Sequence, residues 1–254
     1  MITVHMTSIQ DDRGYNQGFK DSLALHIRTG RRGEAILKEF KTLENIKVLE
    51  IGCGTGELAD RLAKKIQGQV IATDLCRPFI EKARHNFSHS GVIYEVKDFN
   101  KEDDLKWLQE QGPFDYIIGD GILHHLYDKL DLALANLNLL LKKGGRIVFW
   151  EPNIWNPYCR LIFKVPVLRK LAHLEPQEMA FGKRFIDQKL KKASFDDRQI
   201  SYRDFLLPNT PAPLVNTLIA TGNFMEKIPL LNMLSQSVLI SARKKGSTSN
   251  LEIV

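Results

Sequence analysis

The stretch VLEIGCGTGELA, residues 48–59, joins an apolar run, a glycine-rich turn and the start of an amphipathic run. The apolar residues before the turn suit a strand that is covered on both faces of a sheet. Gly52, Gly54 and Gly56 let backbone amides approach a ligand at positions where any Cβ would collide with it. A helix that begins directly after such a turn offers its positive end to polar groups of the ligand. The stretch therefore predicts a cradle for a nucleotide-type cofactor.

The spacing of these glycines indicates which cofactor the turn holds. The dinucleotide-binding fingerprint is G-x-G-x-x-G, and its third glycine lets the helix pack closely on the strand. This chain has Glu57 at that third position, where the side chain is too bulky for close packing. A further carboxylate, Glu50, lies in the strand just before the turn. It suits a cofactor with ammonium and sulfonium charges better than a pyrophosphate, so the turn favours S-adenosylmethionine over NAD.

Five segments in a fixed order carry a resemblance to a known family. The first, VLEIGCGTGELADRLA, resembles motif I of the class I S-adenosylmethionine-dependent methyltransferases, in the seven-stranded Rossmann-like branch that acts on many small molecules. The others are IATDLCRPFIEKAR, YEVKDFN, FDYIIGDGILHHL and LLKKGGRIVFWEPN, and the set covers roughly residues 46–153. The resemblance implies an α/β fold, with a doubly wound, mostly parallel seven-stranded sheet whose last strand is antiparallel.

The resemblance also implies a set of residues that bind S-adenosylmethionine. Asp74 would accept hydrogen bonds from both ribose hydroxyls, and Leu75 would lie against the adenine. Asp98 would take the exocyclic amine of the adenine, and Phe99 would pack on its ring. The alternative for Asp74 and Asp98 is that each caps a helix or orders a loop. The whole expected cofactor set is Glu50, Gly52, Cys53, Gly54, Gly56, Asp74, Leu75, Asp98, Phe99 and Asp120, although Cys53 also suits a small apolar filler.

Length, cysteine content and hydropathy limit the class of protein to which the chain can belong. A chain of 254 residues can bury one substantial core, and alternating strand and helix patterns indicate one α/β domain with additions. We divide it into a helical lead-in (1–45), the methyltransferase domain (46–244) and a flexible tail (245–254). Three cysteines without metal or disulfide spacing suit a reducing cytosol. The sequence shows no signal peptide and no membrane-spanning apolar run, so we expect a cytoplasmic protein. Because no metal-ligand spacing occurs, we expect no metal cofactor.

Hydrophobic periodicity predicts where the elements lie. The lead-in has helical spacing at 22–27 and 34–40, and Tyr15, Phe19 and Arg28 are candidates to contact the ligands. Strands are expected at about 46–51, 69–74, 92–96, 114–118, 146–151, 199–206 and 238–244.

An insert at about 153–193 follows the expected fifth strand, where ligands collect in open α/β sheets. Eleven Lys and Arg against five Asp and Glu between Arg160 and Arg203 give this region a charge of +6, equal to that of the whole chain. Residues 158–174 mix apolar and cationic positions around Pro166, which predicts two short amphipathic helices. They are interpreted either as a packed substrate cap with solvated lysines or as a surface for a lipid headgroup plane or an anionic acceptor.

The loop after the expected fourth strand contains the candidate catalytic residues. Methyl transfer is an in-line displacement, so alignment of the two substrates in a dry pocket provides most of the catalysis. A hydroxyl acceptor also requires a base, and His124 or His125 suits that role. Glu151 and Asn153 are candidates either for acceptor contact or for capping backbone amides. Tyr158 and Tyr202 complete the expected substrate-binding set, with His173 and Arg203 as weaker candidates.

These features predict methyl transfer to a small molecule, with an oxygen of an apolar or anionic metabolite as the favoured acceptor. DNA is excluded as a partner because the fourth-strand loop reads Asp120-Gly121-Ile122-Leu123, without the proline-rich motif of amino-methylating DNA enzymes or a cysteine nucleophile. One alternative is an RNA methyltransferase that uses the basic insert, although no RNA-binding module accompanies it. Another is a noncatalytic protein that keeps the fold as a binding surface. The identity of the acceptor and the oligomeric state do not follow from the sequence.

Overall fold

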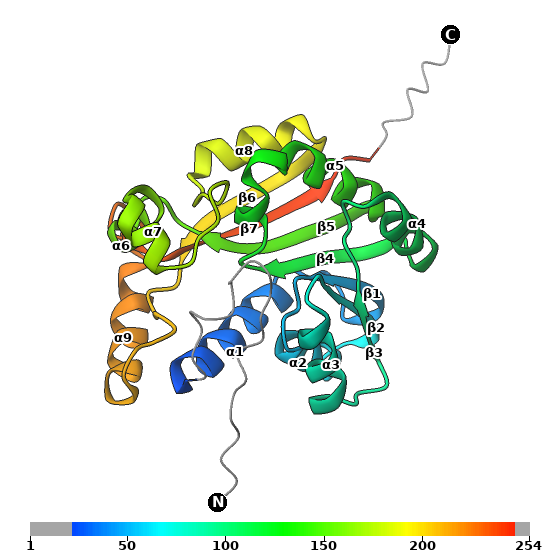
Figure 1. The fold of residues 1–254 in the computed structure, drawn as a ribbon, viewed down its shortest axis with the longest axis horizontal. Helices are drawn as coiled ribbons and strands as arrows, with labels where there is room; N and C mark the ends of the chain where they lie inside the picture. Colours follow the sequence, from blue (N-terminus) through cyan, green and yellow to red (C-terminus); the bar gives the residue numbers. More distant parts are fainter. Residues whose placement is uncertain (1–21, 247–254) are drawn as a thin grey trace, which may run out of the picture.

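A seven-stranded sheet forms the centre of the computed structural model, which describes residues 22–246 (Figure 1). The strand order is β3-β2-β1-β4-β5-β7-β6. Strands β1 to β5 pair in parallel, whereas β7 runs antiparallel to both β5 and β6. This topology confirms the predicted fold class. The strands are β1 Glu44–Ile51, β2 Gln67–Asp74, β3 Val92–Val96, β4 Phe114–Asp120, β5 Leu141–Pro152, β6 Phe195–Arg203 and β7 Ser237–Lys244.

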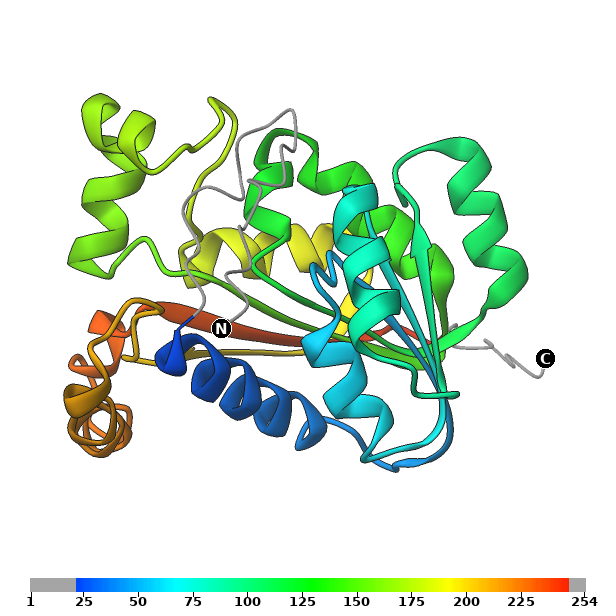
Figure 2. The ribbon, with the colours of Figure 1, turned by 60° about the horizontal axis from the view of Figure 1, so that its bottom comes forward.

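Helices cover both faces of the sheet (Figure 2). On one face lie α1 (Leu23–Leu37), α2 (Glu57–Ala63) and α3 (Arg77–Asn86), which bury their apolar sides in one core cluster. On the other face lie α4 (Glu102–Gln111), α5 (Leu130–Leu140) and α8 (Lys183–Lys192), which share a second cluster. Successive side chains of a strand point to opposite faces. Accordingly, Val48 belongs to the first cluster and Leu49 to the second.

The remaining helices lie at one end of the sheet. These are α6 (Pro157–Lys164), α7 (Pro166–Leu171) and α9 (Ala212–Met225), together with the short 3-10 helix η3 (Asn232–Leu234). Another 3-10 segment, η2 (Leu123–Lys129), follows β4. No helix within residues 22–246 is long and apolar enough to cross a membrane.

The structure refines several expected boundaries. Within its described part the lead-in contains one continuous helix, α1, whose N-terminus is capped by the side chain of Ser22. The expected strand at 199–206 instead spans 195–203, because Asp204 has a left-handed backbone (φ +70°) that ends β6. Pro166 separates α6 from α7, as the proline in the sequence predicts. Tyr15, Phe19 and most of the expected tail lie outside the described residues.

The expected insert at 153–193 has two structurally different parts. Helices α6 and α7 lie beyond the sheet edge, where a cap was expected. Helix α8 packs on the sheet instead, with Ile186 and Leu190 fully buried in the core. Helix α8 therefore covers the strands. Only the first part of the insert borders the pocket at the carboxyl ends of the strands.

Candidate active site

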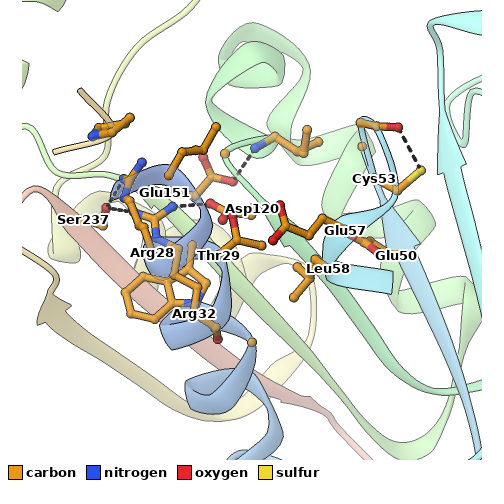
Figure 3. A pocket seen from close by; sticks show the side chains of 18 of the residues that line it. Arg28, Thr29, Arg32, Glu50, Cys53, Glu57, Leu58, Asp120, Glu151 and Ser237 are labelled. Carbon is orange, nitrogen blue, oxygen red and sulfur yellow. Dashed lines mark hydrogen bonds and ion pairs between the residues drawn. The ribbon is translucent and has the colours of Figure 1, made fainter. Parts of the chain in front are cut away.

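A large pocket opens at the carboxyl ends of β1, β2, β4 and β5, between α1 and the α6–α7 segment (Figure 3). Parallel strands present their carboxyl ends at the same edge of a sheet, so residues far apart in sequence meet there. The expected residues that line the pocket are Glu50, Gly52, Cys53, Gly54, Asp74, Leu75, Asp98, Phe99, Asp120, His124, His125, Glu151 and Tyr158. Gly56, Asn153 and Tyr202 are not part of its wall.

The glycine-rich turn has the left-handed backbone that favours glycine. Gly52 and Gly54 have φ values of +69° and +53°. A Cβ on Gly52 would overlap the side chain of Ile122, whereas a Cβ on Gly54 would point into open space. The Gly54 N–H donates a 2.9 Å hydrogen bond to Asp74 Oδ2, and Asp74 Oδ1 accepts another from the Cys76 N–H. Gly54 thus leaves room for a ligand, while Asp74 links the turn to the end of β2.

Gly56 serves packing rather than the pocket. It precedes α2 with φ +86°, and a Cβ there would lie 2.8 Å from both Ala83 and the Tyr94 ring. The Tyr94 hydroxyl also donates to the Gly56 carbonyl at 3.2 Å. The expected cofactor contact at Gly56 is therefore replaced by close packing of three elements. Cys53 packs in the core below the turn and presents only a small part of its surface to the pocket.

Three carboxylates, Glu50, Asp74 and Asp120, lie around the turn, and Glu50 has no cation beside it within residues 22–246. Glu50 is only 2 % exposed, and its Oε2 has no hydrogen-bond partner among the described residues. Burial, together with the nearby Asp120 and Asp74 carboxylates, raises the pKa of Glu50 to about 8. A buried, unpaired carboxylate is costly unless a cation or donor meets it. This arrangement fits a ligand with ammonium and sulfonium groups.

The expected adenine contacts differ in their surroundings. Leu75 is exposed on the pocket wall, where it can pack against a flat ring. The Asp98 side chain accepts a hydrogen bond from the Asn100 N–H, which orders the loop after β3. Phe99 packs in the core cluster and also lines the pocket. Its packing on the adenine stays a prediction.

A buried ion network joins α1 to the carboxyl ends of the strands (Figure 3). The Arg32 guanidinium pairs with Asp120 and with Asp204, and donates to the Ser237 hydroxyl. Arg28, one helical turn earlier, donates to the same Asp204 carboxylate at 2.8 Å. Residues four apart lie on one face of a helix, so the spacing of the two arginines was visible in the sequence. Their partner Asp204 was not, because it lies 172 residues beyond Arg32.

His124 and Glu151 form a buried pair beside the pocket. The His124 Nδ1 lies 2.8 Å from Glu151 Oε2. Glu151 also accepts hydrogen bonds from the backbone N–H groups of Ile122, Leu123 and His124. The carboxylate therefore fixes both the loop and the imidazole. Of the two expected roles of Glu151, the structure shows capping of backbone amides.

Protonation of this pair follows from its burial. Burial, with the neighbouring His125, lowers the pKa of His124 well below its ordinary value. Burial raises the pKa of Glu151 to about 7, although the three backbone donors oppose the rise. A neutral imidazole that donates from Nδ1 to a carboxylate retains its Nε2 lone pair as an acceptor. Nε2 has no hydrogen bond to any described residue, so its lone pair can accept a proton.

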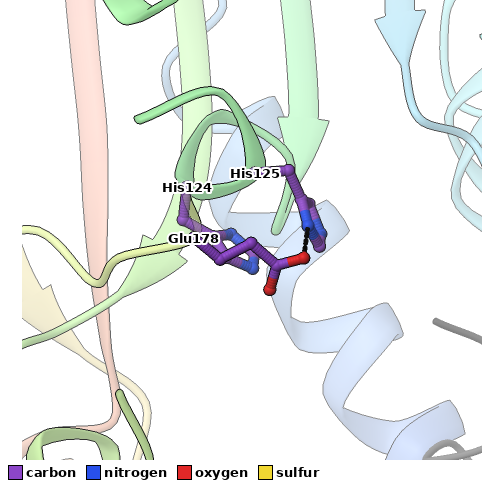
Figure 4. Close-up of side chains that lie close together, drawn as sticks. All are labelled: His124, His125 and Glu178. Carbon is purple, nitrogen blue, oxygen red and sulfur yellow. Dashed lines mark hydrogen bonds and ion pairs between the residues drawn. The ribbon is translucent and has the colours of Figure 1, made fainter. Parts of the chain in front are cut away.

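His125 and Glu178 lie next to this pair (Figure 4). His125 Nδ1 is 2.7 Å from Glu178 Oε1, and the two histidine rings are 4.1 Å apart between centroids. One ligand atom from each of His124, His125 and Glu178 lies within 4.8 Å of the others, so these three residues could hold a metal ion. The sequence did not single out Glu178, which is buried although it lies in a polar, proline-containing stretch.

Two residues of the expected substrate set lie elsewhere. Asn153 is fully buried, and its side chain donates to the carbonyls of Met233 and Ser235 and accepts from the Trp155 N–H. It holds the chain after β5 and cannot contact an acceptor. Tyr202 lies on β6 beneath the Lys183 ammonium, away from the pocket. Tyr158 remains in the wall, at the start of α6.

Comparisons with known proteins agree with this geometry. Residues 48–145 match the family model described as a methyltransferase domain. The squalestatin tetraketide synthase of a Phoma species is 27 % identical over 168 residues, which are 62 % of this chain and 6 % of the synthase. The hybrid PKS-NRPS synthetase poxE of Penicillium oxalicum is 36 % identical over 111 residues, 42 % of this chain and 3 % of that protein. The chain thus spans less than a tenth of the length of the curated relatives it matches.

Solved structures show the same fold at low sequence identity. A S-adenosylmethionine-dependent methyltransferase from Archaeoglobus fulgidus has a TM-score of 0.59 at 18 % identity, covering 86 % of this chain and 94 % of that one. The CurJ carbon methyltransferase has a TM-score of 0.61 at 20 % identity, covering 89 % of this chain and 56 % of that one.

The sheet topology, the glycine turn and its carboxylates define the class I S-adenosylmethionine-dependent methyltransferase fold. Residues 48–145 match a methyltransferase domain within this fold, and the cofactor is S-adenosylmethionine. The predicted class, enzyme type and cofactor are therefore confirmed.

Proposed function

We propose that this methyltransferase acts on an acidic carbon of a small molecule, a carbon flanked by carbonyl groups. S-Adenosylmethionine supplies an electrophilic methyl group, and His124 removes the acceptor's proton. The buried His124–Glu151 pair on the wall of the donor pocket carries this proposal. Amine acceptors have a lone pair of their own, whereas a carbon acid needs a base before it can attack.

The geometry supports a distinct role for each residue of the pair. His124 Nε2 would take the proton from the acceptor carbon. The electron pair left on that carbon would form the new bond to the methyl group, while the methyl–sulfur bond breaks and its electron pair stays on the sulfur of S-adenosylhomocysteine. Glu151 is a positioning residue, since it orients the imidazole and stabilises it once it becomes protonated. Its three backbone hydrogen bonds keep the loop that carries His124 in place.

The choice of carbon is supported by the names of the relatives. Several similar curated proteins are named as polyketide synthases, and one similar structure is a carbon methyltransferase. Polyketide chains contain carbons between two carbonyl groups, whose protons are acidic enough for an imidazole base. A hydroxyl oxygen, the acceptor expected from the sequence, is the second candidate, because the same base would serve it.

Direct product analysis tests this proposal. The protein is incubated with isotopically labelled S-adenosylmethionine and either acetoacetyl-N-acetylcysteamine thioester or a catechol, and the products are analysed by mass spectrometry and NMR. We expect a carbon-bound methyl group on the thioester. Methylation confined to the catechol oxygen would favour the second candidate and refute the first.

A proton-exchange experiment isolates the step assigned to His124. In D₂O with S-adenosylhomocysteine, the protein should accelerate deuterium incorporation between the two carbonyls of the thioester. His124→Ala should abolish this exchange while His125→Ala retains it. Equal exchange by wild type and His124→Ala would contradict the assignment of the base.

A further inference from the structure

Exposed hydrophobic side chains gather at one end of the molecule. Within the part of the chain that the structure describes, eleven of sixteen exposed large hydrophobic residues lie in 154–174 or 211–234, which together make about a fifth of it. We call these two segments the end face. Its exposed members are Trp155, Tyr158, Leu161, Val165, Val167, Leu171, Leu214, Phe224, Leu230, Leu231 and Leu234.

Helix α9 supplies an uncharged part of the end face. No Asp, Glu, Lys or Arg occurs from Pro211 to Met225. Of this helix only Val215 and Gly222 are buried, and Val215 packs in a small cluster with Ala24 and Leu206. Phe224 is 65 % exposed and Leu230, just beyond the helix, is 77 % exposed. A solvated helix ordinarily has a charged outer side, so this composition indicates contact with an apolar phase.

Helices α6 and α7 add positive charge beside these apolar side chains. Between Glu151 and Glu175 the chain has four Lys and Arg residues and no acidic residue. Arg160, Lys164 and Lys170 are exposed and form no ion pair with a described residue. In α8, Lys189 and Lys192 both pair with Asp131, whereas Arg184 and Lys191 are exposed and form no ion pair with a described residue. The cations of α6 and α7 differ from those of α8 in lying beside the exposed apolar side chains of the end face.

The two segments of the end face are joined and border the pocket. Asn156, which caps α6, donates to the Leu234 carbonyl at 2.5 Å. Figures 1 and 2 both place α6, α7 and α9 at the same end of the sheet. Tyr158 and Leu171 also belong to the pocket wall, so the face lies beside the opening through which an acceptor would enter.

We propose that the end face binds the surface of an anionic lipid membrane. Apolar side chains with neighbouring Lys and Arg suit insertion at the level of lipid headgroups, where anionic phosphates meet the cations. A second copy of this chain is a poorer occupant, because a symmetric contact would bring the same unpaired cations together. The face would hold the pocket at the membrane, where lipophilic acceptors concentrate.

Vesicle flotation of the full chain tests this proposal. The probes are vesicles of phosphatidylcholine with and without phosphatidylglycerol. We expect the protein to float with the anionic vesicles and to dissociate at high salt. Each Lys or Arg near such a surface contributes about 5-fold in affinity, so Lys164→Glu/Lys170→Glu should weaken binding by about 25-fold or more. Val167→Ser/Leu230→Ser should weaken it through the lost apolar contact.

Matched variants elsewhere on the surface provide the controls. Leu132→Ser/Leu139→Ser removes two α5 side chains that are each 52 % exposed, and Lys106→Glu/Lys129→Glu reverses two distant charges. These controls should bind vesicles as wild type does, and all variants should still bind S-adenosylhomocysteine, which shows that they are folded. Equal losses in end-face and control variants, or no binding to anionic vesicles, would overturn the proposal. So would binding of a soluble acidic carrier protein without any binding of vesicles.

Discussion

The buried carboxylate of Glu50 dominates the electrostatics of the expected cofactor site. Its carboxylate is buried without a partner in residues 22–246, and its pKa is about 8. In the ligand-free protein the group therefore holds a proton that it loses in the unfolded chain. Its raised pKa makes the folded state less stable as pH rises from about 4.5 to about 8. A cationic ligand that pairs with the ionised Glu50 carboxylate would offset this loss of folded-state stability.

Replacement of Glu50 by glutamine should separate stability from binding. The variant has no charge to bury, so its ligand-free form should exceed wild type in unfolding free energy by a few kcal/mol at pH 8.5 and match it at pH 4. Denaturant unfolding at the two pH values measures this difference. A difference that does not change with pH would contradict the assigned pKa.

The same substitution should weaken binding of the cofactor. S-Adenosylmethionine affinity in Glu50→Gln should fall by about 10-fold or more, since a charge-assisted contact is lost. In wild type, affinity should rise with pH up to about 8, because the ionised carboxylate pairs with the cation. Calorimetric titrations across this range would show an unchanged Kd if Glu50 has no role in binding.

The His124–Glu151 pair makes a prediction about pH. His124 stays neutral well below its ordinary pKa, so the group that titrates near neutrality is Glu151, with a pKa of about 7. With both substrates saturating, kcat should fall as pH decreases through about 7, because protonated Glu151 orients and stabilises the imidazole less well. Glu151→Gln should have a kcat lower by about 10²-fold or more and no such decrease.

If the kcat of Glu151→Gln still decreased with the same midpoint as pH falls, the titrating group would be a residue other than Glu151. His125→Ala provides the matched control, since it removes the neighbouring ring but leaves the pair intact.

At the scale of elements, the glycine turn between β1 and α2 combines two different requirements. Gly54 opens toward the pocket, whereas Gly56 lies against α3 and β3. The sequence shows three similar alternating glycines and predicts one role for all of them. Only packing distinguishes them, because the neighbours Ala83 and Tyr94 come from segments about 30 to 40 residues further along the chain.

Alanine at these two positions should have different effects. Gly56→Ala should lower the unfolding free energy by about 2–4 kcal/mol, through left-handed strain and overlap with Ala83 and Tyr94. Gly54→Ala should cost only the strain, about 1–2 kcal/mol, but should greatly weaken S-adenosylmethionine binding. Thermal unfolding and calorimetry measure the two effects. Equal stability losses with unchanged affinity in Gly54→Ala would contradict this division.

The sequence predicted most elements because periodicity and turn residues are local. All seven strands were expected within a few residues, and Pro166 marked the break between α6 and α7. Residues whose roles depend on distant partners could not be predicted. Asn153 was a candidate either for acceptor contact or for holding the backbone, and the sequence could not decide, because its partners are carbonyls about eighty residues further along the chain. Arg32 and Asp204 likewise meet only after the sheet has formed.

At the scale of the whole molecule, the sheet brings donor and acceptor residues to one edge. The donor residues come from β1, β2 and β4, and the candidate base follows β4. Helix α1 covers this edge from one side, held by the Arg32 network, and α6 and α7 border it from the other. This arrangement brings the reactants together in one pocket, as an in-line reaction requires.

The proposed chemistry requires no metal ion, although His124, His125 and Glu178 could hold one. A metal on His124 Nε2 would occupy the lone pair that is assigned to proton removal. Dialysis against EDTA should therefore leave methyl transfer unchanged within about twofold, a difference of about 0.4 kcal/mol in barrier. Loss of activity that zinc or manganese restores would show that the cluster binds a catalytic metal.

We place a methyl donor at the carboxyl ends of β1, β2 and β4, where the carboxylates bind its cationic groups. Isothermal titration with S-adenosylmethionine and S-adenosylhomocysteine, on wild type and on Asp74→Ala, tests this placement most directly. We expect both ligands to bind wild type at a one-to-one ratio, and Asp74→Ala to bind each of them at least about 10-fold more weakly. Failure of both ligands to bind the folded wild-type protein would contradict the account.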